Sequence, residues 1–229
     1  MLTLHIANKN YSSWSLRPWL LLRELEIPFE ERMHWFARGE DFASFSPSAK
    51  VPCLEDSDTG AVVWDSLAIA EYVYEQFPAV WPSDRIARAW ARSAAAEMHS
   101  GFAALRSICS MNCGVRVRLH EVPPQLARDL ARLEALWADG LDRFGGPWLG
   151  GATFTAVDAF YAPVAFRVLG YQLELDPRSR AYVDRLLERP GMLDWYRAGL
   201  DEPHRDPAHD ADLERVGVVE EDLRSDPLG

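Results

Sequence analysis

The chain has 229 residues, of which 48% are hydrophobic and 26% charged, a composition typical of globular proteins with a sizeable core. Its formal net charge of −11 argues against a nucleic-acid-binding protein, which needs a basic stripe, and against binding to an anionic membrane surface. The three cysteines are Cys53, Cys109 and Cys113, an odd and low number that does not form a disulfide framework. No second pair accompanies Cys109 and Cys113, so we expect no zinc or other metal. With no visible secretory leader or long apolar run, we expect a cytoplasmic protein.

The first 80 residues alternate between strand and helix patterns. The expected order is strand, helix, strand, then two strands and a helix. The strands are expected at 2–7 and 29–35, in a short apolar piece with a proline at 49–56, and at 60–64, and the helices at 15–25 and 66–77. The first helix is expected to begin at about Ser13 to Ser15, which places Pro18 in a first turn whose N–H groups have no partner inside the helix. The first crossover predicts a parallel pair of strands, and the tight turn at Gly60 predicts an antiparallel edge strand.

The second part of the chain is helical throughout. A proline-rich linker at 78–84 precedes expected helices at 85–105, 124–144, 182–187 and 192–200, with a further helix restarting after a glycine-rich break. Beyond Leu200 the chain is acidic and contains prolines, which predicts an extended wrap over the surface or disorder. We therefore expect an α/β domain over 1–80, an all-α domain over 85–200 and an acidic C-terminal tail over 201–229.

A serine cluster, "NKNYSSWSLRP", stands where the first strand turns into the first helix. Serine is favoured at helix starts because its hydroxyl accepts a bond from a free backbone N–H, so Ser13 or Ser15 is expected to cap the helix. The same helix start also favours a negatively charged group, through its dipole and its free N–H groups. The cluster therefore predicts a cap, a reactive site, or both.

Two further signals follow along the chain. Pro52 does not suit a central strand, and a cis bond after Val51 would direct the backbone N–H and C=O of Val51 outward, where an extended peptide can pair with them. Asp65 and Ser66 precede an apolar helix, where they act as an N-cap or hold the carboxylate of a ligand.

In this order, these signals resemble the cytosolic glutathione transferase superfamily. A fourth signal agrees, because Thr155 and Asp158 in "FTAVDAF" have the spacing of a capping box that this family carries. The "RPGMLDWY" and "SAAAEMHSGFAALR" segments are also similar to its helical domain. The resemblance covers roughly residues 1 to 200 and favours the serine-type classes, theta, zeta and their bacterial relatives. It implies a thioredoxin-like βαβ-ββα domain followed by an all-helical domain that lines the cleft for the second substrate.

The resemblance implies a catalytic serine at the turn. Aligned on the first helix, Ser12 takes that position and Ser13 the next, and a shift of one residue would make Ser13 the active one. Tyr11 is a further candidate, which would act as the catalytic tyrosine does in the tyrosine-type classes. The zeta pattern is incomplete, because Trp14 replaces its cysteine and Trp19 its second arginine.

The resemblance also implies the site for glutathione as co-substrate. Val51 would pair its backbone with the cysteinyl unit, Pro52 would be cis, and Asp65 and Ser66 would hold the γ-glutamyl end. Lys50 matches a position that often contacts the glycine carboxylate, although a solvated surface lysine is the alternative.

The expected chemistry needs no metal. Only the thiolate attacks, and an ordinary thiol has a pKa of about 8.5. A serine hydroxyl would donate a hydrogen bond to the sulfur anion, and Arg17, Lys50 and the helix starts would supply positive character around an anionic tripeptide.

The electrophile is expected to bind between the domains. The candidates for its lining are Tyr11, Trp14, Met98, His99, Phe102, Arg106 and Met111. Those on the helical segment are also spaced as core residues are, and core packing is the alternative for each. The basic stretch at 116–120 is expected to be a solvated loop, although it would also favour acidic substrates.

The predicted function is therefore glutathione S-transferase activity on a small electrophile, of the kind used in detoxification, by a cytoplasmic homodimer. A zeta-like cis–trans isomerase of the maleylacetoacetate type and a non-catalytic glutathione-binding or regulatory protein are the alternatives. Neither nucleic acid nor a membrane is an expected partner.

Overall fold

The strand that opens the chain lies inside the sheet. β1 (Leu2–Ala7) is buried along its whole length and pairs in parallel with β2 (Phe29–His34) and antiparallel with β3 (Cys53–Asp56). β4 (Ala61–Trp64) pairs antiparallel with β3 and completes the order β2-β1-β3-β4. The expected parallel crossover and antiparallel edge strand are both confirmed.

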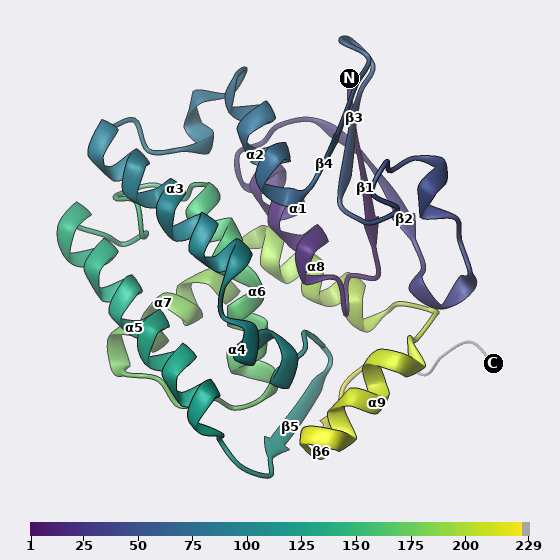
Figure 1. Cartoon of the computed structure of the whole chain (residues 1–229), viewed down its shortest axis with the longest axis vertical. Helices are drawn as coiled ribbons and strands as arrows, with labels where there is room; N and C mark the ends of the chain where they lie inside the picture. The colour runs from purple at the N-terminus through teal and green to yellow at the C-terminus, as the bar shows by residue number, and fades with distance from the viewer. Residues whose placement is uncertain (226–229) are drawn as a thin grey trace.

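The structure is a computed structural model and describes residues 1–225 (Figure 1).

The crossover helix α1 (Ser13–Glu24) is buried on both of its sides. It packs against β1 and α2 (Ser66–Tyr74) of its own domain and against α6 (Ala156–Gly170) and α8 (Pro190–Leu200) of the helical domain. Pro18 was expected in the first turn, but α1 begins at Ser13 and Pro18 therefore lies in the second turn. The helix thus continues past a residue that cannot donate a backbone hydrogen bond. Packing on both sides compensates for that lost bond.

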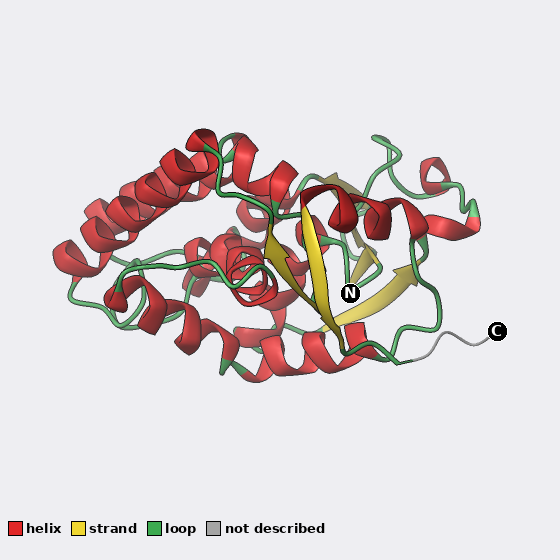
Figure 2. Cartoon of the chain, turned by 90° about the horizontal axis from the view of Figure 1, so that it is seen from below, coloured by secondary structure: helices red, strands yellow, loops and turns green. Residues whose placement is uncertain are grey.

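The remaining elements form the helical domain and the C-terminal segment. The helical domain contains α3 (Arg85–Ser100), α4 (Ala103–Ile108), β5 (Val115–Leu119), α5 (Pro124–Phe144), α6 (Ala156–Gly170), α7 (Pro177–Leu187) and α8 (Pro190–Leu200). The C-terminal segment contains α9 (Pro207–Val216) and β6 (Gly217–Asp222). Short 3₁₀ helices lie at η1 (Phe36–Arg38), η2 (Phe42–Ser44) and η3 (Pro78–Val80). Figure 2 shows most of the helices stacked on one side of the strands.

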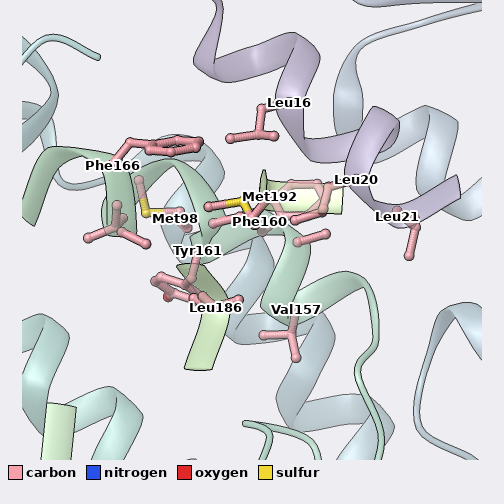
Figure 3. Close-up of a cluster of buried hydrophobic side chains, with 14 of the residues drawn as sticks. Leu16, Leu20, Leu21, Met98, Val157, Phe160, Tyr161, Phe166, Leu186 and Met192 are labelled. Carbon is pink, nitrogen blue, oxygen red and sulfur yellow. The ribbon is translucent and has the colours of Figure 1, made fainter. Parts of the chain in front are cut away.

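One hydrophobic core joins the sheet domain to the helical domain. Leu16 and Leu20 of α1 point toward Phe160 of α6 and Met192 of α8 in Figure 3, and all four side chains are buried. α6 is buried almost all around, as expected for a helix that is apolar on every face.

A buried carboxylate fastens α1 to the start of α8. Glu24 accepts a hydrogen bond from the backbone N–H of Gly191 at 2.8 Å and also pairs with Arg189. A Cβ at Gly191 would lie 2.7 Å from Leu20 Cδ1 and 2.8 Å from Glu24 Oε1, so a larger residue there would displace the ends of both side chains.

The long helix expected at 85–105 is instead two helices. α3 ends at Ser100 and α4 starts at Ala103, because Phe102 adopts a left-handed backbone with φ 53°. The Arg106 guanidinium donates to the carbonyls of His99 and Gly101, which satisfies backbone acceptors released by the break.

The C-terminal segment is neither extended throughout nor disordered over its described part, which ends at residue 225. Residues 207–222 form α9 and β6, and β6 pairs antiparallel with β5. The stretch at 116–120, expected to be a loop, therefore contributes most of a strand in which Val115 and Val117 are buried. Its partner lies about a hundred residues later, so the local sequence could not indicate the pairing. Residues 226–229 of the expected tail lie outside the described residues.

The capping box at the start of α6 is confirmed. Asp158 is fully buried and accepts from the backbone N–H groups of Thr155 and Leu149 at 2.9 and 3.0 Å and from the Tyr182 hydroxyl at 3.0 Å. Burial raises the pKa of Asp158 to about 6. One side chain thus organises the loop before α6 and its contact with α7.

Removing this carboxylate is expected to destabilise the whole protein. Asp158→Ala leaves three buried donors without their acceptor, at about 1–3 kcal/mol each, so we expect the free energy of unfolding to fall by roughly 3 kcal/mol or more. Urea unfolding measures the loss. Asp184→Ala, which removes an exposed pair with Arg180, is the control and should change stability by about 0.5 kcal/mol or less. A loss below about 1 kcal/mol in Asp158→Ala would contradict this role.

Candidate active site

Ser12 is the residue that caps α1, rather than Ser13 or Ser15. Its Oγ donates to the Ser15 Oγ at 2.7 Å and lies 3.4 Å from the Ser15 backbone N–H, and the Ser15 hydroxyl in turn accepts from Ala7 N–H at 3.2 Å. Ser12 is only 5% exposed. This chain of hydroxyls ties the end of β1 to the start of α1.

Ser13 occupies the first helical position and is more exposed than Ser12. Both serines line a cavity between the two domains, and within residues 1–225 the Ser13 hydroxyl has no hydrogen-bond partner. Of the two serines that the sequence analysis proposed, Ser13 thus has the hydroxyl that is free to bind a ligand.

Tyr11 is occupied by the C-terminal segment. Its hydroxyl accepts from Arg224 Nη1 at 2.9 Å and from the Asp206 backbone N–H at 3.2 Å, and donates to Asp210 at 3.2 Å. The ring is 4% exposed, and burial raises the pKa of its hydroxyl. Tyr11 therefore forms a wall of the site while its hydroxyl is engaged elsewhere.

The serine turn faces a cavity of about 770 Å³ between the two domains. Both domains and α9 contribute to its lining, which includes Tyr11, Ser12, Ser13, Trp14, Lys50, Val51, Arg106, Met111, Arg167 and His209. The structure thus brings together four of the residues expected here from the sequence, which are Tyr11, Trp14, Arg106 and Met111.

Three residues expected in this cavity lie elsewhere. Met98 and Phe102 belong to the hydrophobic core, because the face of α3 that carries Met98 packs on α6 and the break at Phe102 turns its ring toward Tyr161. His99 instead lies beside the start of α2, with its Nε2 3.4 Å from Asp65 and its ring edge against Trp14. Burial lowers the pKa of His99.

A second hollow, of about 440 Å³, shares part of its wall with the first. It collects the five residues expected to hold the tripeptide, which are Lys50, Val51, Pro52, Asp65 and Ser66. The expected cis bond between Val51 and Pro52 is confirmed. β3 begins only at Cys53, so the backbone N–H and C=O of Val51 stay outside the ladder.

The start of α2 carries an unsatisfied polar group and a strained backbone. The Ser66 hydroxyl is buried and has no hydrogen-bond partner within residues 1–225. Asp65 caps the helix by accepting from Leu67 N–H at 2.8 Å, and its φ of 80° lies in the left-handed region. An unpaired buried hydroxyl and a strained residue both cost free energy, and both are typical of ligand sites.

Two residues of the site were missed by the sequence analysis. Arg167 comes from α6, where it is the one charged side chain besides Asp158 in an otherwise apolar helix, a signal that the sequence did contain. Glu202 gave no such signal. It lies after α8 and accepts from Asn8 Nδ2 and Asn10 N–H, both at 3.3 Å, and from Lys9 N–H. It therefore holds the loop that leads to the serine turn.

Within residues 1–225, no group of three or more histidine, cysteine or acidic side chains is arranged as a metal site. None of the helices described over the same residues is both long and apolar enough to cross a membrane.

Two protein-family models match the chain. Residues 11–76 match the model described as glutathione S-transferase, N-terminal domain, and residues 117–198 match glutathione S-transferase, C-terminal domain. Glutathione S-transferase GstB of Escherichia coli strain K12 is 27% identical over 189 residues, covering 76% of this chain and 88% of that protein. The glutathione S-transferase-like protein OpS6 of Beauveria bassiana is 23% identical over 208 residues, covering 82% and 91%.

Solved structures show the same fold. A glutathione transferase homologue from Burkholderia GL BGR1 with bound glutathione has a TM-score of 0.65 at 23% identity and covers 86% of this chain and 97% of its own. Ure2p in complex with S-hexylglutathione has a TM-score of 0.66 at 19% identity and covers 86% and 98%. The expected fold class, a thioredoxin-like domain followed by an all-helical domain, is confirmed.

Titration of Glu202 is expected to make stability depend on pH. Burial raises the pKa of Glu202 from 4.5 to about 7, so the fold favours its protonated form. The stability that this form contributes is fully present below pH 4.5 and is lost as the pH rises through about 7. We expect the free energy of unfolding of the wild type, relative to Glu202→Gln, to fall between these pH values in urea titrations.

Glu214→Gln, on the exposed part of α9, is the matched control and should follow the wild type at every pH. Parallel stability curves for the wild type and Glu202→Gln would show that Glu202 titrates alike in the folded and unfolded chains, contrary to this expectation.

Proposed function

Because the chain belongs to the glutathione S-transferase superfamily and is an enzyme of that class, we propose that it activates glutathione through a serine hydroxyl for attack on a small electrophile. One observation carries the proposal. The free Ser13 hydroxyl at the start of α1 and the unpaired Ser66 hydroxyl at the start of α2 border two adjoining hollows. The wall that the hollows share is formed by Trp14, Lys50, Val51 and Arg106.

The second hollow suits the ends of a tripeptide. The Ser66 hydroxyl and the free N–H groups at the start of α2 would donate hydrogen bonds to the γ-glutamyl carboxylate. Asp65 would pair with the γ-glutamyl amino group. Val51 offers backbone groups for the cysteinyl unit in the manner of an added strand, and Lys50 offers a charge for the glycine carboxylate.

The serine turn supplies the chemistry. A hydrogen bond to a charged group contributes about 1.5–3 kcal/mol, and one pKa unit corresponds to about 1.4 kcal/mol. One hydroxyl would therefore lower the pKa of a bound thiol by roughly one to two units, and the start of α1 adds about 0.3–1 kcal/mol of the same sign. The sulfur then uses its electron pair to form the bond to the electrophilic carbon.

We assign the donor role to Ser13 and a supporting role to Ser12. What favours Ser13 is its exposure and its free hydroxyl, whereas the Ser12 proton lies in a 2.7 Å bond to Ser15. The proposal includes a homodimer in the cytoplasm, which rests on the family resemblance.

The two serines are distinguished by substituting each alone. Ser13→Ala should lower kcat/KM for conjugation at least tenfold and raise the pKa of the bound thiol by roughly one to two units, because the sulfur anion loses its donor. Ultraviolet titration of the enzyme-bound thiolate measures the pKa. Urea unfolding should show no loss of stability.

Ser12→Ala should instead lower stability by about 1 kcal/mol, since α1 loses its cap. If Ser12→Ala gives the larger rise in thiol pKa, the donor is Ser12, and if neither variant changes that pKa the serine mechanism is wrong.

The γ-glutamyl site is tested with Asp65→Asn, which keeps the cap and removes the charge. We expect glutathione to bind roughly tenfold more weakly, because a charged hydrogen bond contributes about 1.5–3 kcal/mol and tenfold in affinity is about 1.4 kcal/mol. Calorimetric titration measures the affinity. Asp84→Asn, at the cap of α3, is the matched control and should bind as the wild type does. Equal affinity in Asp65→Asn and wild type would place the γ-glutamyl end elsewhere.

A further inference from the structure

The cavity beside the serine turn has a charge opposite to that of the protein. The chain carries 35 acidic and 24 basic residues. Yet within residues 1–225 no aspartate or glutamate lines this cavity, while Lys50, Arg106 and Arg167 do. A low-dielectric cleft lined by one sign of charge concentrates ligands of the opposite sign.

The two arginines of the helical domain are held in place by backbone carbonyls. Arg106 donates through Nη1 to His99 O at 3.1 Å and Gly101 O at 3.3 Å, and its guanidinium carbon lies 4.7 Å from the centre of the Trp14 ring. Arg167 is 4% exposed and donates through Nε to Cys109 O at 2.8 Å and through Nη1 to Pro163 O at 3.1 Å. These bonds position the guanidinium groups and leave Nη2 of each available to a ligand.

A third arginine lies behind Trp14 and adds to the positive charge. Arg17 is 1% exposed, its Nε and Nη1 have no hydrogen-bond partner within residues 1–225, and its guanidinium carbon lies 4.1 Å from the Trp14 ring centre. Burial and the neighbouring Arg167 and Arg106 lower the pKa of Arg17 to about 9. Burial likewise lowers the pKa of Arg167 to about 10.

Within residues 1–225 no carboxylate forms an ion pair with this cluster, although the more distant charge of Asp65 acts to raise the pKa of Arg17. The ion pairs found over residues 1–225 involve other arginines, and none reaches Arg17, Arg106 or Arg167 within 4.0 Å. Buried charges are normally paired, so an unpaired cluster at a cavity indicates an anionic ligand. Arg106 borders both hollows, whereas Arg167 borders only the larger one. The proposed sites for the two glutathione carboxylates lie at Lys50 and Ser66 and use neither arginine, so both remain for another anion.

We propose that the second substrate is an anionic electrophile, whose carboxylate or comparable acid group binds Arg106 and Arg167 while its reactive carbon faces the serine turn. This inference rests on the proposed function, since it names the substrate class of the same site. For an activated aryl halide that carries a carboxylate, the glutathione sulfur forms the new bond to the ring carbon. The carbon–halogen bond breaks, and the halide leaves with the electron pair.

Two product-like ligands of equal size test the charge preference without turnover. S-(4-carboxybenzyl)glutathione and S-(4-carbamoylbenzyl)glutathione differ only in the acid group. We expect calorimetric titration of the wild type to show the carboxylate ligand binding at least tenfold tighter. Arg106→Gln should reduce that ratio at least fivefold, and Arg106→Lys should retain part of it.

Arg143→Gln is the matched control, because Arg143 is exposed on α5, is paired with Asp139 and lines neither hollow. It removes the same charge and should leave the ratio unchanged. Thermal unfolding checks that each variant is folded, and Arg167→Gln provides a second test from a different helix. Equal binding of the two ligands by the wild type, or a tenfold preference kept in both Arg106→Gln and Arg167→Gln, overturns the inference.

Turnover separates this inference from the proposed function. Conjugation of glutathione to 4-chloro-3-nitrobenzamide, combined with equal binding of the two ligands, would support the transferase and refute the anionic preference. A preference for the carboxylate ligand without conjugation of either the amide or 4-chloro-3-nitrobenzoate would support the anion site and refute the transferase. Failure to bind glutathione or either ligand would refute both.

Discussion

The burial of α1 on two sides is the constraint on which the rest of the structure depends. One side of the helix packs on β1 and the other on α6 and α8, so its N-terminus is held at the junction of the two domains. Each fully buried leucine contributes about 1.5–3 kcal/mol, whereas the dipole of a helix start contributes about 0.3–1 kcal/mol. Packing therefore fixes where the helix begins, and the polar chemistry of the serine turn makes use of a position that the core has already set.

The C-terminal segment completes this arrangement from the other direction. Glu202 holds the Asn8–Asn10 loop, and Arg224 with Asp210 binds the Tyr11 hydroxyl. In Figure 1, α9 lies at the lower right, below the sheet and beside the helical domain. The last part of the chain therefore positions the turn that follows the first strand. It also engages the Tyr11 hydroxyl, and because the Ser12 hydroxyl is bonded to Ser15, Ser13 keeps the free hydroxyl of the turn within residues 1–225.

Charge is distributed to match this division of roles. The acidic residues pair with arginines over the surface, while the cavity is lined by basic and apolar side chains. Trp14 lies against the guanidinium groups of both Arg17 and Arg106, a favourable contact between a ring face and a cation. Where the zeta pattern has a cysteine, this chain thus has a ring that helps to hold unpaired positive charge beside the proposed site of the thiolate.

The sequence by itself determined the features that depend on neighbouring residues. These are the strand–helix order of the first 80 residues, the capping box of Asp158, and the cap at Asp65. It also pointed to Val51, Pro52, Asp65 and Ser66 as one group, and the structure places them around one hollow. Only the tertiary structure decided the break at Phe102, the pairing of β5 with β6, and the meeting of Arg17, Arg106 and Arg167 near one tryptophan. These features arise from contacts between residues tens to hundreds of positions apart, which hydrophobic periodicity and local spacing do not record. The same holds for the serine turn, where a hydrogen bond to Ser15 engages the Ser12 hydroxyl and leaves that of Ser13 free.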